Sequence, residues 1–173
     1  IGDGFIYLAL LEQCQLDARW FTLMFVGTNA FFLLLAVPLG RLADRTSRAG
    51  IFVLGHLALA GAYLCAGAGN SLVFVLLALA LLGVFYAATD GVLAALAGQL
   101  APAGATSTAI GTAQTVVAVA RLVASTGFGV LWILLGSTGA MLISAGLLLV
   151  LVPAAWMLVL RPGSRPAPGR RAA

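Results

Sequence analysis

Short charged segments divide this sequence into long apolar stretches, and these segments hold most of its charge. Its 173 residues include nine basic and five acidic side chains, and 62% of the residues are hydrophobic. A soluble domain takes roughly a quarter of its residues from the four charged types, so this chain has too few to cover a surface in water. The composition therefore excludes a soluble enzyme and a nucleic-acid-binding domain, and it predicts an integral membrane protein.

The number of apolar stretches sets the expected architecture. A helix rises about 1.5 Å per residue and the hydrocarbon core is about 30 Å thick, so the chain has room for about six spans. We expect an all-α fold in which residues 1–160 form one bundle of six transmembrane helices in the lipid bilayer, and residues 161–173 a basic, disordered tail. The expected helices, bounded by charges, Gly, Pro and Asn, are 3–13, 20–39, 50–66, 72–100, 107–135 and 140–160.

The positions of the arginines predict how the bundle is oriented. One group, at 41–48, lies between the second and third stretches, and the other, at 161–171, follows the sixth. An even number of spans separates the groups, so both lie on one side, which the positive-inside rule makes cytoplasmic. The carboxy terminus is then cytoplasmic. No initiator Met or signal peptide precedes the first stretch, so we expect the chain to begin partway through a longer protein.

The sequence gives no indication of an enzyme or a metal site. Cys14 and Cys65 stand in no motif, and we expect them to be free packing residues. No cluster of His, Cys and acidic residues has metal-ligand spacing, and no nucleophile stands beside a base. We therefore expect neither a metal ion nor another cofactor.

The segment at 40–48, Gly-Arg-Leu-Ala-Asp-Arg-Thr-Ser-Arg, is expected to be a nine-residue cytoplasmic turn. By composition alone it is typical of an ordinary positive-inside loop. Its residue order, however, resembles the G-x-L-A-D-R-x-G-R signature of the major facilitator superfamily, which follows the second helix of each six-helix half. Ser47 stands where that family usually has Gly, and Ala49 where a second base often follows. The matching residues are Gly40, Leu42, Ala43, Asp44, Arg45 and Arg48.

A second resemblance extends over the fourth and fifth stretches. Residues 85–93, Pro102 and residues 111–132 are similar to the carboxy-terminal half of bacterial members of the same family. The loop at 103–105 lacks the acid and arginine that those members often carry. The resemblance implies the carboxy-terminal half of a twelve-helix transporter, whose partner is an amino-terminal six-helix half.

The resemblance also implies a function. A secondary transporter of this family, located in the plasma membrane, moves a small-molecule substrate by alternating access, often coupled to protons as in efflux. Spans one, two, four and five would line the path, and spans three and six would be peripheral. The turn at 40–48 would help to latch the cytoplasmic side, with Gly40, Asp44, Arg45 and Arg48 as the gating residues.

Two ionisable residues lie inside apolar stretches, and this observation is independent of the family. A charge at the centre of a membrane helix costs roughly 2.5 to 3.5 kcal/mol, so Asp90 and Arg121 need partners or water. By helical rise their depths differ by about 6 Å, which a guanidinium can bridge if the helices are neighbours. Two helix faces are expected to line a cavity, one on the fourth stretch and one on the fifth. The first has Tyr86, Asp90, Leu93 and Ala97, and the second has Gln114, Ala118, Arg121, Ser125 and Trp132. Tyr86, Asp90, Gln114 and Arg121 are the candidate pathway residues.

Two interpretations of the charged pair stay open. Asp90 either titrates or contacts substrate, with Arg121 as its counter-charge, or the two form a structural ion pair. Asp3 and Glu12 lie near the ends of the first stretch, where water is available, and a pathway role is the less favoured interpretation for them. A lone His56 on an apolar helix is more typical of a hydrogen bond to a neighbour.

Two other classes of protein compete with the half-transporter. A six-span chain could work as a homodimer that supplies both halves by symmetry. A membrane interaction protein without transport activity would need no charge inside its spans, so Asp90 and Arg121 count against it.

Overall fold

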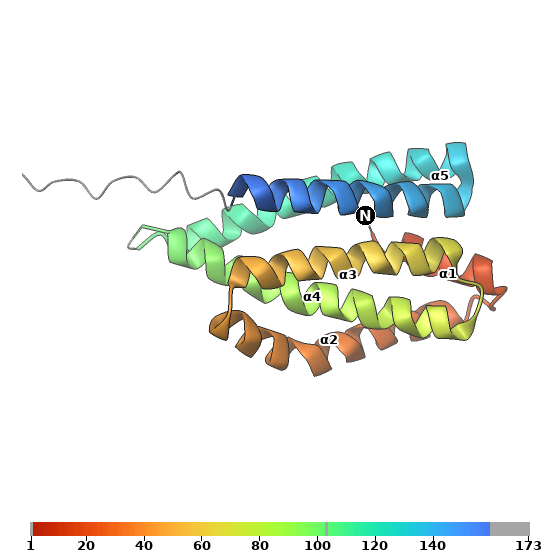
Figure 1. The fold of residues 1–173 in the computed structure, drawn as a ribbon, viewed down its shortest axis with the longest axis horizontal. Helices are drawn as coiled ribbons and strands as arrows, with labels where there is room; N and C mark the ends of the chain where they lie inside the picture. The colour runs from red at the N-terminus through yellow and green to blue at the C-terminus, as the bar shows by residue number, and fades with distance from the viewer. Residues whose placement is uncertain (1, 103, 160–173) are drawn as a thin grey trace, which may run out of the picture.

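The computed structural model describes residues 2–102 and 104–159 of the chain. These residues form helices and no strands, in agreement with the expected all-α fold (Figure 1). The predicted tail at 161–173 lies outside the described residues. The helices are α1 (Asp3–Cys14), α2 (Trp20–Arg45), α3 (Arg48–Ala68), α4 (Leu72–Leu100) and α5 (Thr106–Val159).

Helix α5 consists of two arms that double back on each other. Gly136, with φ 73° and ψ 176°, interrupts the helix, and Figure 1 shows the chain reversing there. The described residues therefore hold six helical segments in the predicted order. By length and composition, α2, α3, α4 and α5 can each cross a membrane. The 12-residue α1 is about 18 Å long, shorter than the hydrocarbon core, so six crossings stay a prediction.

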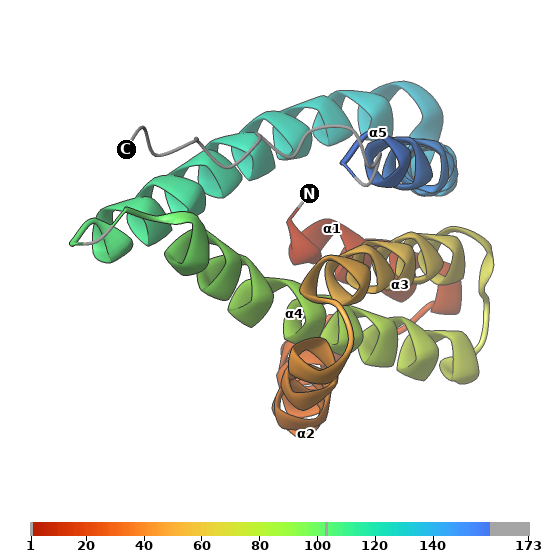
Figure 2. The same ribbon diagram turned by 60° about the vertical axis from the view of Figure 1, so that its left-hand side comes forward.

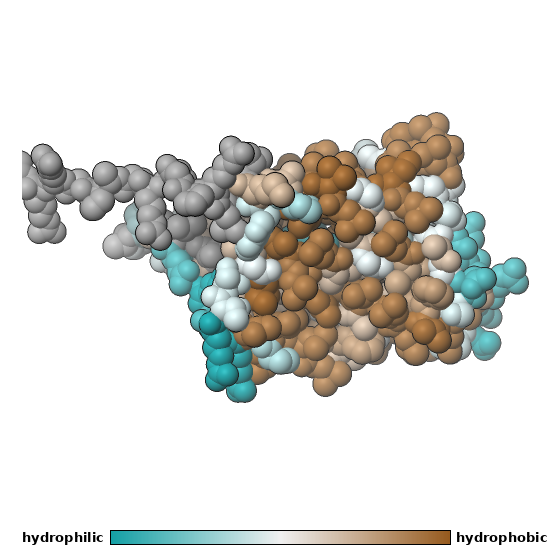
Figure 3. Space-filling model, in the orientation of Figure 1, coloured by the Kyte–Doolittle hydropathy of each residue, from teal (hydrophilic) through white to brown (hydrophobic). Residues whose placement is uncertain are grey.

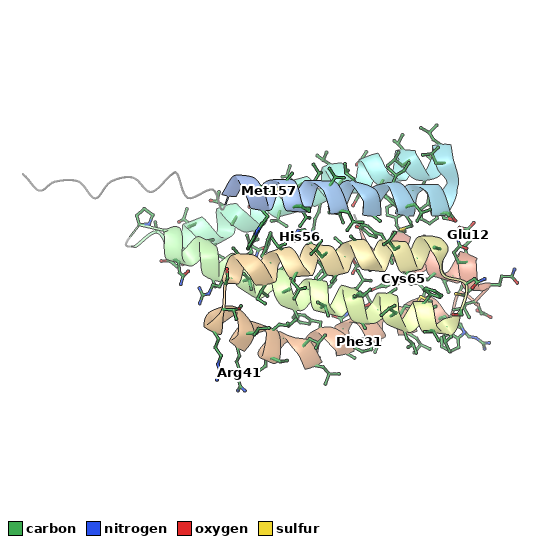
Figure 4. All side chains as sticks on the ribbon, in the orientation of Figure 1. Glu12, Phe31, Arg41, His56, Cys65 and Met157 are labelled. Atoms are coloured by element: carbon green, nitrogen blue, oxygen red, sulfur yellow. The ribbon has the colours of Figure 1, made fainter. Side chains whose placement is uncertain are left out.

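The distribution of apolar and polar residues over the surface is typical of a protein embedded in a membrane. Figure 3 shows a broad apolar band over the helices, with polar residues gathered at the two ends of the molecule. Arg41 and Met157 lie at one end and Glu12 at the other (Figure 4). The arginine-rich segment and the end of α5 therefore share a side, as the even number of intervening segments requires.

The expected nine-residue turn at 40–48 is wrong. Helix α2 continues through Pro38 and Gly40 to Arg45, and α3 begins at Arg48, so only Thr46 and Ser47 separate the two helices. Arg, Leu and Ala are good helix formers, and a helix that leaves the apolar layer gains nothing by ending there. The turn expected at 136–139 is also shorter, because only Gly136 departs from helical geometry.

The expectation that the third span is peripheral is wrong for this part of the chain. Helix α3 lies between α4 and α5 and contacts both (Figure 2). An added Cβ at Gly55 would lie 2.9 Å from Ala88 of α4, and one at Gly67 would lie 3.0 Å from Met141 of α5. Small residues allow this close approach. Overall hydrophobicity does not distinguish an apolar helix in contact with other helices from one in contact with lipid, so it could not place α3.

Helix α1 is held in the core despite its length. Ile6, Tyr7 and Leu10 are almost completely buried, and the Tyr7 hydroxyl donates to Thr28 Oγ1 of α2 at 2.9 Å. At its far end, the Gln13 side chain donates to Thr138 Oγ1 just after the reversal in α5. These contacts fix the position of the first turn of α1, which carries Asp3.

Candidate functional site

A cavity of about 640 Å³ lies among α3, α4 and both arms of α5, with the start of α1 at its edge. Most of its wall is apolar, and its polar side chains come from helices far apart in the sequence. Such a mostly apolar cavity with a few convergent polar groups is the usual form of a small-molecule site. These polar residues are Asp3, His56, Tyr63, Tyr86, Thr89, Asp90, Gln114, Arg121 and Ser144.

Asp90 and Arg121 form an ion pair in this cavity. The Arg121 Nη2 atom lies 3.5 Å from Asp90 Oδ1, so the contact that their depths allow is present. The Arg121 side chain is 47% exposed and the Asp90 side chain 52%, so both can contact a ligand or water. The guanidinium carbon also lies 5.8 Å from the centre of the Tyr86 ring, within the range of a cation–π contact.

Asp3 joins the same group of side chains. The Tyr86 hydroxyl donates to Asp3 Oδ1 at 2.6 Å, which connects the first turn of α1 to the middle of α4. Asp3, Tyr86 and Asp90 also line a second, smaller cavity of about 240 Å³, together with Thr28 and Asn29 of α2. The sequence favoured no pathway role for Asp3, because the contact joins residues 83 positions apart and periodicity along one helix cannot reveal it.

The helix faces predicted to line a cavity are found in part. Tyr86, Asp90 and Leu93 of α4 line it, as do Gln114 and Arg121 of α5. The other residues expected on the α5 face do not, because the first arm of α5 turns a different face, with Val117, Ala124 and Leu131, to the cavity. Ala97 lines a separate pocket near the 101–105 connection, and Trp132 packs against Phe5 and Phe128. Ala118 and Ser125 do not line this cavity.

Helix α3 supplies two cavity-lining residues for which the sequence did not favour a pathway role. His56 and Tyr63 line the cavity, and Figure 4 labels His56 on α3. The His56 Nδ1 atom lies 2.9 Å from the carbonyl oxygen of Phe52, and its ring packs against Phe52 and Phe85. The expected hydrogen bond of His56 to a neighbour is confirmed.

The residues of the expected gating segment lie at the junction of α2 and α3. Arg48 donates from Nε and Nη2 to Asp44 Oδ1, at 3.2 and 2.7 Å, which joins the two helices across the turn. Arg45 is exposed, and an added Cβ at Gly40 would have no neighbour within 4 Å among the described residues. The structure therefore brings Asp44 and Arg48 together but gives Gly40 no close contact.

Ser47, the second residue of the turn between α2 and α3, caps the start of α3. The Ser47 hydroxyl accepts a hydrogen bond from the Gly50 backbone N–H at 3.2 Å and so caps the amino terminus of α3. Its backbone is extended, with φ −146° and ψ 118°, so this position does not require glycine.

In the described part of the chain, Cys14 and Cys65 are free, and no group of His, Cys, Asp or Glu could hold a metal ion.

Comparison with known proteins gives one match. The family model described as Major Facilitator Superfamily matches residues 4–173, which is nearly the whole chain. No curated protein and no solved structure matches the chain.

Proposed function

Since the chain belongs to the major facilitator superfamily, we propose that it is the carboxy-terminal six-helix half of a transporter that works by alternating access. Members of this family are multi-pass membrane proteins, secondary transporters rather than enzymes, that bind small molecules within the membrane. Substrate would cross between this half and an amino-terminal half related to it by pseudo-twofold symmetry. Proton-coupled efflux across the plasma membrane is the form we favour, with the carboxy terminus in the cytoplasm.

The observation that carries the proposal is the ion pair of Asp90 and Arg121 inside the cavity. Ionisable groups are expensive within a membrane, and those that face a cavity mark a substrate or ion pathway by default. Both side chains are about half exposed in an otherwise apolar surrounding, as a ligand contact requires. Tyr86 and Gln114 line the same cavity and would contact substrate beside the pair.

The junction of α2 and α3 would act at the cytoplasmic side. The Asp44–Arg48 pair holds the ends of two helices together, and the exposed Arg45 is free to contact another part of the transporter. Gly40, with no neighbour within 4 Å in this half, leaves space for a close approach by the other half. A latch of this kind would restrain the cytoplasmic ends while the cavity faces outward.

Transport by the full-length protein in liposomes tests the proposal. Asp90→Asn and Arg121→Gln should each lower the transport rate at least about tenfold, because each removes a charge from the cavity. Asp17→Asn is the matched control, since Asp17 pairs with Arg19 at 3.7 Å in the exposed α1–α2 connection. If Asp90→Asn left both the rate and its pH dependence unchanged, the pair would be a structural link only.

The isolated 173-residue chain distinguishes the competing architectures. Reconstituted alone, it should transport nothing, because half of the path would be missing. Transport by the chain as a monomer would refute the half-transporter. Transport that appears only with dimer formation would favour a homodimeric transporter.

A further inference from the structure

The acidic and basic side chains of the cavity do not balance. Asp3 and Asp90 face it with two carboxylates, and Arg121 with the only guanidinium among the described lining residues. The His56 Nδ1 atom lies 2.9 Å from the Phe52 carbonyl oxygen, and the two carboxylates and one guanidinium together have a formal charge of −1. A net charge in an apolar surrounding is costly unless a counter-charge occupies the site.

The two carboxylates differ in their partners. Asp90 is paired with Arg121 at 3.5 Å, whereas the hydrogen-bond partner of Asp3 within the described residues is the neutral hydroxyl of Tyr86. That hydroxyl, 2.6 Å from Oδ1, fixes the direction of the Asp3 carboxylate without neutralising it. Asp3 also lies where the larger and the smaller cavity meet, so a ligand can reach it. Asp3 is therefore the acidic residue of the cavity that has no cationic partner among the described residues.

The cavity wall suits an organic ligand rather than a bare ion. Its aromatic rings come from three different helices: Phe52 and Tyr63 from α3, Phe85 and Tyr86 from α4, and Phe128 from α5. Aromatic faces attract cations, and apolar walls gain from burying hydrocarbon. The volume of about 640 Å³ lies within the usual range of roughly 300 to 1,000 Å³ for small-molecule sites.

We propose that this cavity binds an amphipathic organic cation whose positive charge lies against Asp3, while Arg121 neutralises Asp90. Tyr86 is the positioning residue, because its hydroxyl orients the Asp3 carboxylate and its ring forms part of the aromatic wall. The inference rests on the proposed transport function, since it names the class of substrate that this cavity would carry.

Two ions of equal shape and opposite charge test the proposal without any substitution. Equilibrium dialysis with the purified full-length protein would compare tetraphenylphosphonium, a cation, with tetraphenylborate, its anionic counterpart. The cation should bind at least about tenfold more tightly, which corresponds to about 1.4 kcal/mol. Equal or tighter binding of the anion would overturn the proposal.

Substitutions then test whether Asp3 is the side chain that binds the cation. Asp3→Asn should weaken cation binding about tenfold or more, and Asp17→Asn, in the exposed connection, should leave it unchanged. Tyr86→Phe keeps the ring and the carboxylate, so cation binding should fall less than about fivefold. If Asp3→Asn kept wild-type affinity and thermal stability, Asp3 would not be the binding group. If the Asp3→Asn protein did not fold, Asp3→Glu would be measured in its place. The Asp3→Glu protein keeps a carboxylate and should still prefer the cation, and loss of that preference would contradict the proposal.

The same measurements separate this inference from the transport function on which it rests. A full-length protein that transports another solute but does not bind the cation keeps the proposed function and refutes the inference. A protein that binds the cation in this cavity but transports no solute refutes the proposed function.

Discussion

The Arg121 Nη2 atom lies 3.5 Å from Asp90 Oδ1, and this contact links the middle of α4 to the first arm of α5 across the cavity. Ion pairs that solvent can reach typically stabilise a protein by about 0 to 1 kcal/mol. Because both side chains are about half exposed, the pair contributes little to the stability of the fold. We therefore expect the pair to matter for the interaction of the two charges with a ligand in the cavity rather than for stability.

Exchanging the charges of Asp90 and Arg121 distinguishes a structural role of the pair from a role in transport. Asp90→Arg with Arg121→Asp retains an ion pair, so its thermal stability in detergent should stay within about 1 kcal/mol of the wild type. Transport should stay low, because each charge now stands on the wrong helix for a substrate. Each single substitution places two like charges together and should be less stable than the double variant. Recovery of transport by the double variant would show that the pair serves structure alone.

The cap at Ser47 gives a prediction about the turn between α2 and α3. Ser47→Ala removes the acceptor of the Gly50 N–H and should lower stability by about 1 kcal/mol. Ser47→Gly should cost only a few tenths of a kcal/mol, because Gly leaves that N–H open to water and is itself a good capping residue. Thermal melting of the two variants in one detergent checks the order. A Gly variant as unstable as the Ala variant would contradict the cap.

Local chemistry explains which features the sequence predicted. The long apolar stretches, and the charged, Gly and Pro residues between them, located the helical segments within a few residues apart from the end of α2. Membrane helices must satisfy their own backbone hydrogen bonds, so such stretches form helices. Helical rise and the cost of charge in lipid made a contact between Asp90 and Arg121 possible, but only the packing of α4 against α5 shows that they pair. Helix ends were less predictable, since α2 continues to Arg45 past the apolar layer.

Features that depend on which helices are neighbours could not be predicted. The contact of Asp3 with Tyr86 and the cavity positions of His56 and Tyr63 require the packing of α1 and α3 against α4 and α5. Hydrophobicity carries no such information in a membrane, because lipid and helix neighbours are equally apolar. The small residues of α3 were the one available sign, since small residues mark close helix contacts. They are Gly50, Gly55, Gly61 and Gly67, with Ala58, Ala60 and Ala62.

The contact of α2 with α4 depends on Gly83. A Cβ added there would lie 2.9 Å from the Phe32 backbone nitrogen and closer still to the Phe31 side chain, so the helices would have to separate. Gly83→Ala should lower stability by about 1 to 3 kcal/mol, the usual cost of overpacking. Gly146→Ala is the control, because an added Cβ there has nothing within 4 Å and should be neutral or slightly stabilising. Equal melting temperatures for both variants would argue against the α2–α4 contact.

The reversal within α5 depends on the backbone at Gly136. Its φ of 73° with ψ of 176° lies in a region that essentially only glycine occupies, while the space around it is open. The cost of Gly136→Ala is therefore conformational rather than steric and should be about 1 to 3 kcal/mol. Gly111→Ala, in a helical and open position of the same α5, should by contrast gain up to about 1 kcal/mol. Thermal unfolding of both variants in detergent would measure the difference, and a stable Gly136→Ala protein would mean that the two arms do not reverse at this residue.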